Sequence, residues 1–403
     1  MAEFSSRQKY ERPLPARSAS EGQNRPEREN AADSLKIIAM TKLEALVSLN
    51  MVGEIGSIRL GKLLDYFGKF ENVFSAASEK LIAVAGISEN VANRIHTFKA
   101  EDLSKELETA QKLGLEIITL DDADYPENLR NIPSPPIVLY VKGRIEKEDS
   151  LSIGIVGSRR ASYYGLSSAE KFAADLACCG LTIVSGMARG IDTAAHKGAL
   201  KAKGRTLAVI GSGFKNIYPE ENIKLAEEIS QNGAVISEFS INTQPLKENF
   251  PRRNRLISGL SLGTLVVEAA RNSGALITAD FALEQGKEVF CLPGRIDSIF
   301  SFGTNELIKQ GAKLVAAKED ILEELLIPLA AGIEEVKIKN RLQDHLSDSE
   351  SVLYGLIPAE PVSLDELLEK TSLQIPRAYE ILLKLKMRKL IRQLPGKQFM
   401  RSN

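Results

Sequence analysis

The stretch that decides the fold is residues 151–196, LSIGIVGSRRASYYGLSSAEKFAADLACCGLTIVSGMARGIDTAAH. An apolar run stops at Gly157, an alanine-rich helical pattern follows, and a second apolar run ends at Ser185 and Gly186. Short buried strands read as continuous apolar runs, and two parallel neighbours need a crossover helix between them. We therefore expect a strand, helix and strand whose two loops lie at the carboxyl ends of the strands, where open α/β sheets bind ligands.

From residue 152 onward, apolar runs and helical patterns alternate regularly. The runs predict strands at residues 152–156, 181–184, 206–210, 234–238, 263–267, 288–292 and 313–316, after an earlier strand at 115–120. Such alternation is typical of a parallel sheet with helices on both faces. The predicted fold class is therefore α/β, with a Rossmann-like, doubly wound, mostly parallel sheet over residues 112–328. Prolines at 133, 135 and 136 precede the apolar run 137–141, which favours an edge strand or a lead-in segment over a central strand.

A tail and a helical segment precede this domain. Residues 1–33 are rich in Pro, Ser, Arg and Glu, so we expect a disordered tail. Residues 34–111 show short helical patterns separated by glycine hairpins at 53–56 and 85–88, as in tandem helix-hairpin-helix or SAM-like modules. Such hairpins either offer backbone N–H groups to a phosphate or are only the turns of a small helical bundle.

The C-terminal end has the pattern of a winged helix. After a polar linker at 329–347, residues 348–403 read as three helices followed by a short hairpin. The third helix of such a domain is the recognition helix in proteins that read duplex DNA. Residues 376–403 hold eight Lys or Arg residues against one acid, Glu380, so this end of the chain is basic. Contact with duplex DNA and contact with a protein partner both remain open for this domain.

The composition limits the classes of function. The 403 residues carry a net charge of -1, so nucleic-acid binding has to come from local clusters of cations. Three cysteines lie inside apolar segments, which favours buried thiols in the reducing cytoplasm over disulfides. No window approaches the roughly 20 apolar residues of a membrane span, and the polar N-terminus has no signal-peptide core. We expect a cytoplasmic protein that does not insert into membranes.

The loops at the predicted carboxyl edge of the sheet share groups that bind anions. Glycines allow a close backbone approach, serines offer hydroxyls, and arginines grip phosphate oxygens in bidentate fashion. A third element, the helix that begins in NFPRRNRLISG at 249–259, carries three arginines within four positions, which favours contact with a polyanion. The candidate residues for contact with a polyanion are Gly157, Ser158, Arg159, Arg160, Ser185, Gly186, Arg189, Lys215, Arg252, Arg253 and Arg255.

Catalytic and cofactor patterns are weak in this sequence. The loop after residue 210 departs from G-x-G-x-x-G because Asn216 replaces the third glycine, which argues against a dinucleotide cofactor. Asp192 and His196 stand four positions apart on one helical face, which favours a contact that holds the loop over acid–base catalysis. Glu268 is the best candidate for a catalytic carboxylate, or it is a buried acid that caps the following helix. No His/Cys cluster has metal spacing. We therefore expect no catalytic set, no cofactor and no metal.

Several long blocks of the chain resemble one known family. GSRRASYYG, SGMARGIDTAAH, GSGFKNIYPEEN, FPRRNRLISGLS and VVEAARNSGALITADFALEQGKEVFCLPG occur in the order found in the DprA (Smf) family of DNA-processing proteins. The resemblance implies a non-enzymatic protein that binds single-stranded DNA, forms homodimers through the Rossmann-like domain, protects incoming DNA in natural transformation and loads the RecA recombinase. It also implies a DNA-backbone pocket built from residues 157–159 and 185–186, from Arg252 and Asn254, and from the neighbouring arginines. Simpler members of the family lack the basic winged helix.

Two other functions fit parts of the pattern. One is a Rossmann-like hydrolase of nucleoside monophosphates that uses Glu268. Such enzymes show Pro-Gly-Gly-x-Gly-Thr just before the acid, whereas this chain has Gly263-Thr264 too early and no Pro-Gly-Gly. The other is a winged-helix transcription regulator with a ligand-sensing α/β domain. That regulator would bind duplex DNA sequence-specifically and would ignore single strands.

Overall fold

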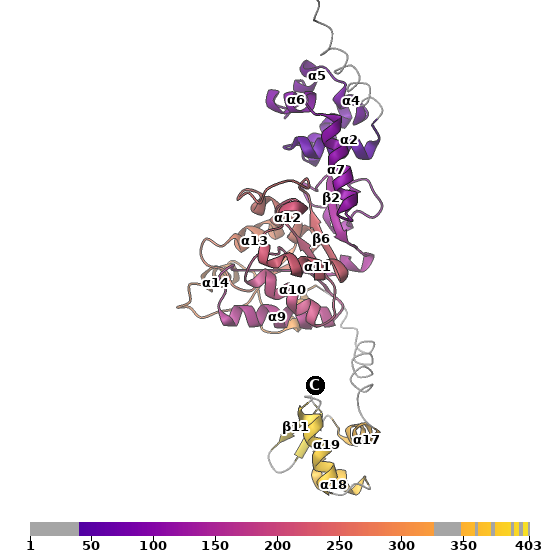
Figure 1. Ribbon diagram of the computed structural model, residues 1–403. Coiled ribbons are helices and arrows are strands. Elements are labelled where there is room, and N and C mark those ends of the chain that lie inside the picture. Colours follow the sequence, from indigo (N-terminus) through magenta and orange to yellow (C-terminus); the bar gives the residue numbers. More distant parts are fainter. Residues whose placement is uncertain are drawn as a thin grey trace, which may run out of the picture. The chain divides into compact units, whose positions relative to one another are not determined.

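The computed structural model describes residues 40–325, 348–358, 362–371, 375–387, 391–394 and 398–401 (Figure 1). The predicted tail at 1–33 and the predicted linker at 329–347 lie outside these residues. Contacts divide the chain into two compact units, Met1–Ile321 and Leu322–Asn403. Among the residues described, no helix is both long and apolar enough to cross a membrane.

The first unit begins with a module of short helices. They are α2 (Lys42–Val52), α3 (Ser57–Phe67), α4 (Glu71–Phe74), α5 (Ser78–Ile82), α6 (Glu89–His96) and α7 (Ala100–Lys112). Thr41 and Glu44 form a reciprocal capping box that starts α2. In the first glycine hairpin, Glu54 accepts an ion pair from Arg94 of α6 at 2.7 Å, and its carbonyl accepts a bond from Arg59 of α3. Both arginines beside the hairpins therefore hold the module together, which favours the interpretation of the glycines as turns.

A nine-stranded sheet follows, with the order β1-β2-β6-β5-β4-β3-β7-β8-β9. Strands β3 to β9 run parallel, and β2 is antiparallel to both β1 and β6. The mostly parallel sheet is thus confirmed, but β2 is not an edge strand, because β1 pairs with its outer side. The prolines at 133, 135 and 136 lie in the segment that precedes β2. The strands are β1 (Glu116–Thr119), β2 (Val138–Gly143), β3 (Ser152–Val156), β4 (Thr182–Ser185), β5 (Thr206–Val209), β6 (Gly233–Ser237), β7 (Gly263–Val266), β8 (Glu288–Cys291) and β9 (Lys313–Leu314).

Helices cover both faces of the sheet. Ile229 of α11 shares a core with Ala208, whereas Leu256 of α12 shares a core with Leu207. Because successive strand residues point to opposite faces, α11 and α12 lie on opposite sides. The helices of this domain are α8 (Glu127–Arg130), α9 (Tyr163–Cys178), α10 (Ile191–Lys201), α11 (Ile223–Gln231), α12 (Asn249–Leu260), α13 (Gly274–Glu284), α14 (Phe302–Lys309) and α15 (Lys318–Glu324), with 3-10 turns η1 (Lys147–Ser150), η2 (Phe214–Asn216) and η3 (Glu220–Asn222).

The strand order contains one reversal that positions the site. Strands β3 to β6 are added outward in one direction, and the chain then returns so that β7 pairs with the other side of β3. Connections leave β3 and β7 toward opposite faces, which opens a crevice beyond their carboxyl ends. The loops after β3 and β7 therefore meet there, although they are about a hundred residues apart in the sequence.

The second unit has the winged-helix arrangement. It contains α17 (Asp348–Leu356), β10 (Val362–Ser363), α18 (Leu364–Glu369), α19 (Ile375–Met387), β11 (Ile391–Leu394) and β12 (Gln398–Arg401), with sheet order β10-β12-β11. Leu353, Ile381 and Phe399 are among the side chains of its own small core. The three predicted helices and the hairpin are confirmed, and β10 is an addition. Of the basic residues counted in the sequence, Arg388, Lys389 and Lys397 lie outside the described residues.

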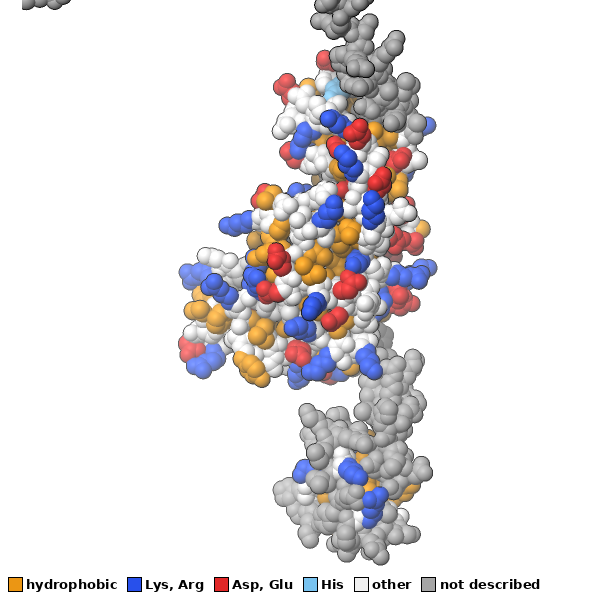
Figure 2. All heavy atoms as spheres, viewed as in Figure 1, with side chains coloured by type: hydrophobic (Ala, Val, Ile, Leu, Met, Phe, Trp, Pro, Cys, Tyr) orange, Lys and Arg blue, Asp and Glu red, His pale blue; other side chains and the backbone are white. Residues whose placement is uncertain are grey.

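Charges of both signs are interspersed over the visible face of the described residues in the first unit (Figure 2). This distribution agrees with the near-neutral net charge of the chain. A site for a polyanion therefore depends on a local group of cations rather than on the field of the whole molecule.

Candidate nucleic-acid interface

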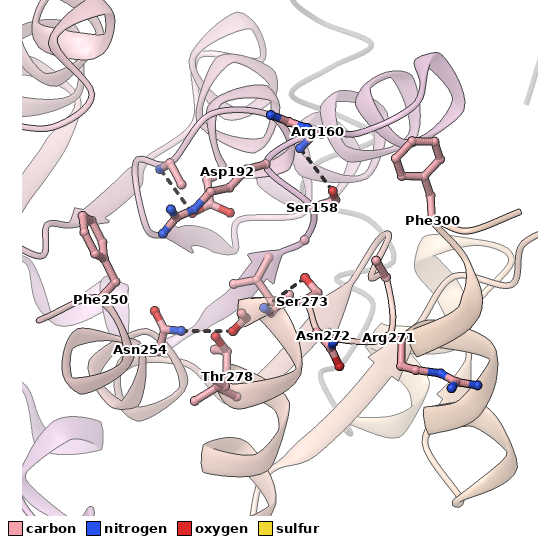
Figure 3. Close-up of a pocket in the computed structure, with 18 of the residues that line it drawn as sticks. Ser158, Arg160, Asp192, Phe250, Asn254, Arg271, Asn272, Ser273, Thr278 and Phe300 are labelled. Carbon is pink, nitrogen blue, oxygen red and sulfur yellow. Dashed lines mark hydrogen bonds between the residues drawn. The ribbon is translucent and has the colours of Figure 1, made fainter. Parts of the chain in front are cut away.

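A cavity of about 1280 Å³ opens at the reversal point of the sheet (Figure 3). Its walls come from the loops that follow β3 to β8, from α12, and from the starts of α10, α13 and α14. Five cations, Arg159, Arg160, Lys247, Arg253 and Arg271, line this cavity together with two acids, Asp192 and Asp297. The cations outnumber the acids, so the cavity suits an anionic ligand.

The loop after β3 is fixed by backbone contacts on both sides. The amide of Ser158 donates to the carbonyl of Glu268 at 2.8 Å, which ties this loop to the end of β7. The hydroxyl of Ser158 accepts a bond from the amide of Arg160 at 3.2 Å. A side chain at Gly157 would lie 2.6 Å from Ile191, so only glycine fits at that position. The rigid turn leaves the side chains of Arg159 and Arg160 exposed at the cavity.

Arg253 forms the buried base of the site. Its side chain extends from α12 to the carboxyl edge of the sheet. There it donates to the carbonyl of Gly186, just after β4, and to the carbonyl of Val209, at the end of β5. The residue is 3% exposed, and a side chain at Gly186 would collide with its guanidinium at 2.7 Å. Asp192 of α10 lies beside the same guanidinium and accepts a bond from the amide of Ala188 at 3.3 Å. Arg253 thus connects α12 to the loop after β4.

Burial shifts the ionisation of this pair. Desolvation raises the pKa of Asp192 to about 6, although the charge of Arg253 pulls it down. Desolvation also lowers the pKa of Arg253 to about 10, where Asp192 acts in the opposite direction and Arg159 adds a smaller lowering by repulsion. At neutral pH the pair is ionised, and it sits under the exposed cations of the loop after β3.

Aromatic rings adjoin the exposed arginines. The guanidinium of Arg159 lies 5.0 Å from the ring centre of Phe250, and Phe250 meets Tyr218 edge to face at 5.9 Å. The guanidinium of Arg189 lies 5.8 Å from the ring centre of Tyr218 and forms an ion pair with the carboxylate of Glu221 at 2.7 Å. Cation–π contacts of this kind orient a guanidinium without neutralising its charge. Arg159 therefore keeps its charge for a ligand, whereas that of Arg189 is paired.

The comparisons with known proteins agree with this geometry. Residues 116–326 match the family model described as DNA recombination-mediator protein A, and residues 338–397 match the DprA winged helix domain. The chain belongs to the DNA recombination-mediator protein A family. This result confirms the resemblance to DprA (Smf) proteins.

Individual relatives extend the match over most of the chain. Protein Smf from Synechocystis sp. is 35% identical over 386 residues, which cover 87% of this chain and 97% of that protein. The DNA processing protein DprA from Bacillus subtilis is 42% identical over 234 residues, or 58% of this chain and 78% of that protein. The X-ray structure of DprA from Streptococcus pneumoniae superposes with a TM-score of 0.62 at 37% identity and covers 71% of this chain and 98% of that one.

Half of the residues predicted for this family's site meet at the cavity. Gly157, Ser158, Arg159, Arg160, Arg253 and Asn254 line it. Gly186 lies directly behind it against Arg253, as described above. Asn254 is nearly buried and donates to the carbonyl of Gly274 at 3.2 Å, so it holds α12 to the start of α13.

The other predicted residues do not line the cavity. The hydroxyl of Ser185 is buried and donates to the carbonyl of Ile155 at 2.6 Å, so it joins β4 to β3. Arg255 is half-buried, pairs with Glu238 and donates to the carbonyl of Ser134. Successive residues of a helix turn by about 100°, so Arg253 points to a different side of α12 from Arg252 and Arg255. The other three predicted residues, Arg189, Lys215 and Arg252, are exposed cations that do not line the cavity.

The sequence analysis missed the contribution of the loops after β7 and β8. Arg271, Asn272 and Ser273 follow β7 and line the cavity, and residues 296–300 after β8 form its outer rim. Ile296 in that rim is fully exposed, and Phe300 lies at the cavity in Figure 3. The polar run RNSG at 271–274, a few residues after the buried strand β7, was the available signal, because a polar run also follows β3.

The two candidate catalytic residues face other groups. The carboxylate of Glu268 accepts bonds from the amide of Ser162 at 2.9 Å and from its hydroxyl, so it holds the start of α9 rather than capping the following helix. His196 is buried, and its Nδ1 forms a hydrogen bond with the hydroxyl of Thr206 at 2.7 Å instead of a contact with Asp192. Burial lowers the pKa of His196 to about 3. Neither residue lines the cavity. Within the described ranges, no group of three His, Cys, Asp or Glu side chains could hold a metal ion.

Proposed function

We propose that this protein binds single-stranded DNA at the cavity and acts as a recombination mediator. The observation that supports this proposal most directly is the state of Arg159, which is exposed at the cavity and has no carboxylate partner in the described part of the chain. Arg189, Arg205, Arg255 and Arg295 each pair with a carboxylate, whereas no carboxylate in the described part of the chain forms an ion pair with Arg159. An exposed guanidinium that is oriented by a ring and left without an acid is suited to a phosphate oxygen.

The shape of the site favours a single strand over a duplex. Phe250, Tyr218 and Phe300 line the same cavity as the cations. Aromatic rings stack on bases that are unpaired, and each such contact contributes about 1 to 3 kcal/mol with little dependence on sequence. In a duplex the bases are already stacked on each other, so these rings would find no partner.

The family membership supports the wider role. The matched family is described as DNA recombination-mediator protein A. We infer protection of incoming single strands during natural transformation, loading of the RecA recombinase in the cytoplasm, and binding without chemical turnover of the DNA. The winged helix would add a contact with duplex DNA or with a protein partner.

The sheet also offers a surface for a homodimer. β9 (Lys313–Leu314) is its outermost strand on one side, and Leu314 is 46% exposed. An edge strand with unpaired backbone groups is a ready template for a second chain. Homodimerisation through the Rossmann-like domain is therefore part of the proposed function.

Salt-dependent binding to oligothymidylate tests the proposal. Arg159→Ala and Arg160→Ala should each weaken binding equally for different base compositions. Removing one cation that binds a phosphate should flatten the plot of log affinity against log salt by about 0.7. Arg144→Ala is the matched control, because Arg144 is exposed and follows β2 at the amino end of β6, away from the cavity. Affinities of both variants equal to that of the control would refute the site.

Enzymatic and regulatory alternatives predict other outcomes. Release of a base from nucleoside monophosphates would indicate a hydrolase. Against this function, the carboxylate of Glu268 already accepts hydrogen bonds from Ser162. Tight binding to one duplex sequence without affinity for single strands would indicate a transcription regulator. Both assays use the intact chain under the same conditions as the oligothymidylate titration.

A further inference from the structure

A second cavity of about 550 Å³ adjoins the first on the face that carries α9 and α10. Residues from the first turns of both helices line it, together with the loop after β3. Arg159 and Arg160 line both cavities. The two cavities therefore share the loop that carries these two cations.

The lining of the second cavity suits a nucleic-acid strand. Lys197 of α10 is exposed there and supplies a third cation. The acid in the lining, Glu170, is held by Lys201 at 2.8 Å, so its charge is already compensated. Gly190 and Ala194 form a lining of small residues, which lets a backbone approach closely.

An exposed ring lies beside these cations. Tyr163, in the first turn of α9, is 87% exposed and lines the second cavity. A tyrosine next to lysine and arginine side chains is the combination that single-strand binding surfaces use, with the ring for a base and the cations for phosphates.

Resting on the proposed function, we infer that the second cavity holds further nucleotides of the same strand that occupies the first. The strand passes over the loop of Arg159 and Arg160, one of its bases stacks on Tyr163, and Lys197 neutralises a phosphate. The site on one protomer is thus a track of two cavities, and its affinity depends on the length of the strand.

A length series of thymidine oligomers tests this track in the intact protein. Wild-type affinity should rise in two steps between about 2 and 16 nucleotides. Tyr163→Ala and Lys197→Ala should remove the second step and leave the affinity for the shortest bound oligomer unchanged. The expected loss for the longest oligomer is about tenfold for Tyr163→Ala, together with a salt slope lower by about 0.7 for Lys197→Ala. Both side chains are exposed, so neither substitution should alter folding.

The control is Lys224→Ala, which removes an exposed lysine of α11 that lines neither cavity. The track is refuted if Tyr163→Ala and Lys197→Ala match this control at every oligomer length. The proposed function fails in a different way. In that case the wild-type protein binds no oligomer, or Arg159→Ala has no effect even on the shortest one that binds.

Fluorescence gives a second readout that locates the strand. The chain contains no tryptophan, so Tyr163→Trp introduces a single indole at the second cavity. Oligomers long enough to pass the loop should quench its emission, whereas the shortest bound oligomers should not. Quenching by thymidine monophosphate alone would overturn the track, because it would indicate an independent mononucleotide site.

Discussion

Replacing Arg253 with methionine tests the buried base of the site. Arg253 donates to the carbonyls of Gly186 and Val209, and its guanidinium lies beside the buried carboxylate of Asp192. Methionine fills a similar length of apolar space but offers no donor and no charge. The Arg253→Met variant therefore leaves two carbonyls without this donor and one buried carboxylate without its cation.

The size of the loss follows from those unpaired groups. Removing one partner of a directly bonded buried ion pair costs about 3–5 kcal/mol, and this value is the upper bound for Asp192, whose carboxylate lies beside the guanidinium of Arg253 without a direct ion pair. The folded-state pKa of Asp192 is about 6, above its usual value near 4 in an unfolded chain. The folded state thus binds more protons at Asp192 between these two values, and the contribution of Asp192 to the free energy of unfolding falls as pH rises through about 4 to 6. Without Arg253 the pKa rises further, so the fall extends to higher pH.

Urea unfolding at pH 5, 6, 7 and 8 measures this effect. The difference in unfolding free energy between wild type and Arg253→Met should grow from pH 5 to pH 8, because titrations shared by both proteins cancel in the difference. The double variant with Asp192→Asn should lose this pH dependence and recover part of the stability. A difference that stays constant with pH, or a loss below about 1 kcal/mol, would contradict the assignment of Asp192 and Arg253 as a coupled buried pair.

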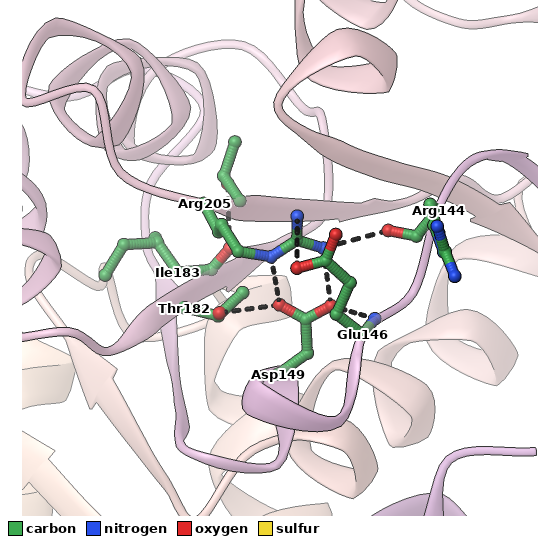
Figure 4. Close-up of polar contacts among 7 residues, drawn as sticks. Arg144, Glu146, Asp149, Thr182, Ile183 and Arg205 are labelled. Atoms are coloured by element: carbon green, nitrogen blue, oxygen red, sulfur yellow. Dashed lines mark hydrogen bonds and ion pairs between the residues drawn. The ribbon is translucent and has the colours of Figure 1, made fainter. Parts of the chain in front are cut away.

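Three further substitutions test other contacts by the same unfolding measurement. Gly186→Ala places a carbon 2.7 Å from the guanidinium of Arg253 and should reduce both stability and DNA affinity, whereas a variant with wild-type affinity would contradict the role of Arg253 in the site. Lys287→Met removes the ammonium that donates to three carbonyls at the end of α12 and should cost about 2–4 kcal/mol. Arg205→Ala strands the buried carboxylate of Asp149 (Figure 4) and should cost about 3–5 kcal/mol. DNA affinity at temperatures where this last variant is folded should not change, because Asp149 precedes β3 at the amino edge of the sheet.

The strands and the first half of the site could be predicted from local sequence. Buried parallel strands are continuous apolar runs, so their positions agree with the structure to within about one residue, except that β2 and β9 end two residues from the predicted limit. The turn after β3 could be predicted equally well, because Gly157, Ser158, Arg159 and Arg160 are consecutive in the chain. Side chains that lie next to each other in sequence after a strand reach the same edge of the sheet, whatever the strand order is.

The second half of the site depended on information that periodicity does not carry. Arg271 and Asn272 reach the cavity because β7 pairs with β3, and no local pattern gives the order of strands. The arginines at 252, 253 and 255 looked equivalent as a charge run, but the turn of α12 buries Arg253, pairs Arg255 with Glu238 and leaves Arg252 exposed. The hydrogen-bond partner of Glu268 could not be predicted for the same reason, because Ser162 lies in the loop after β3, whereas Glu268 follows β7.

The arrangement of charges is suited to the binding of an anion that we propose for this site. The carboxylate of Asp192 compensates Arg253 from within the protein, so the buried cation is stable before any ligand arrives. Desolvation is the main cause that lowers the pKa of Arg253, but the charge of Arg159 adds to it, which means that the two guanidiniums repel each other in the free protein. A phosphate beside Arg159 would offset that repulsion and would meet no acid paired with Arg159 in the described part of the chain. Because the backbone bond from Ser158 to Glu268 already fixes the loop, little ordering of the chain would oppose the attraction.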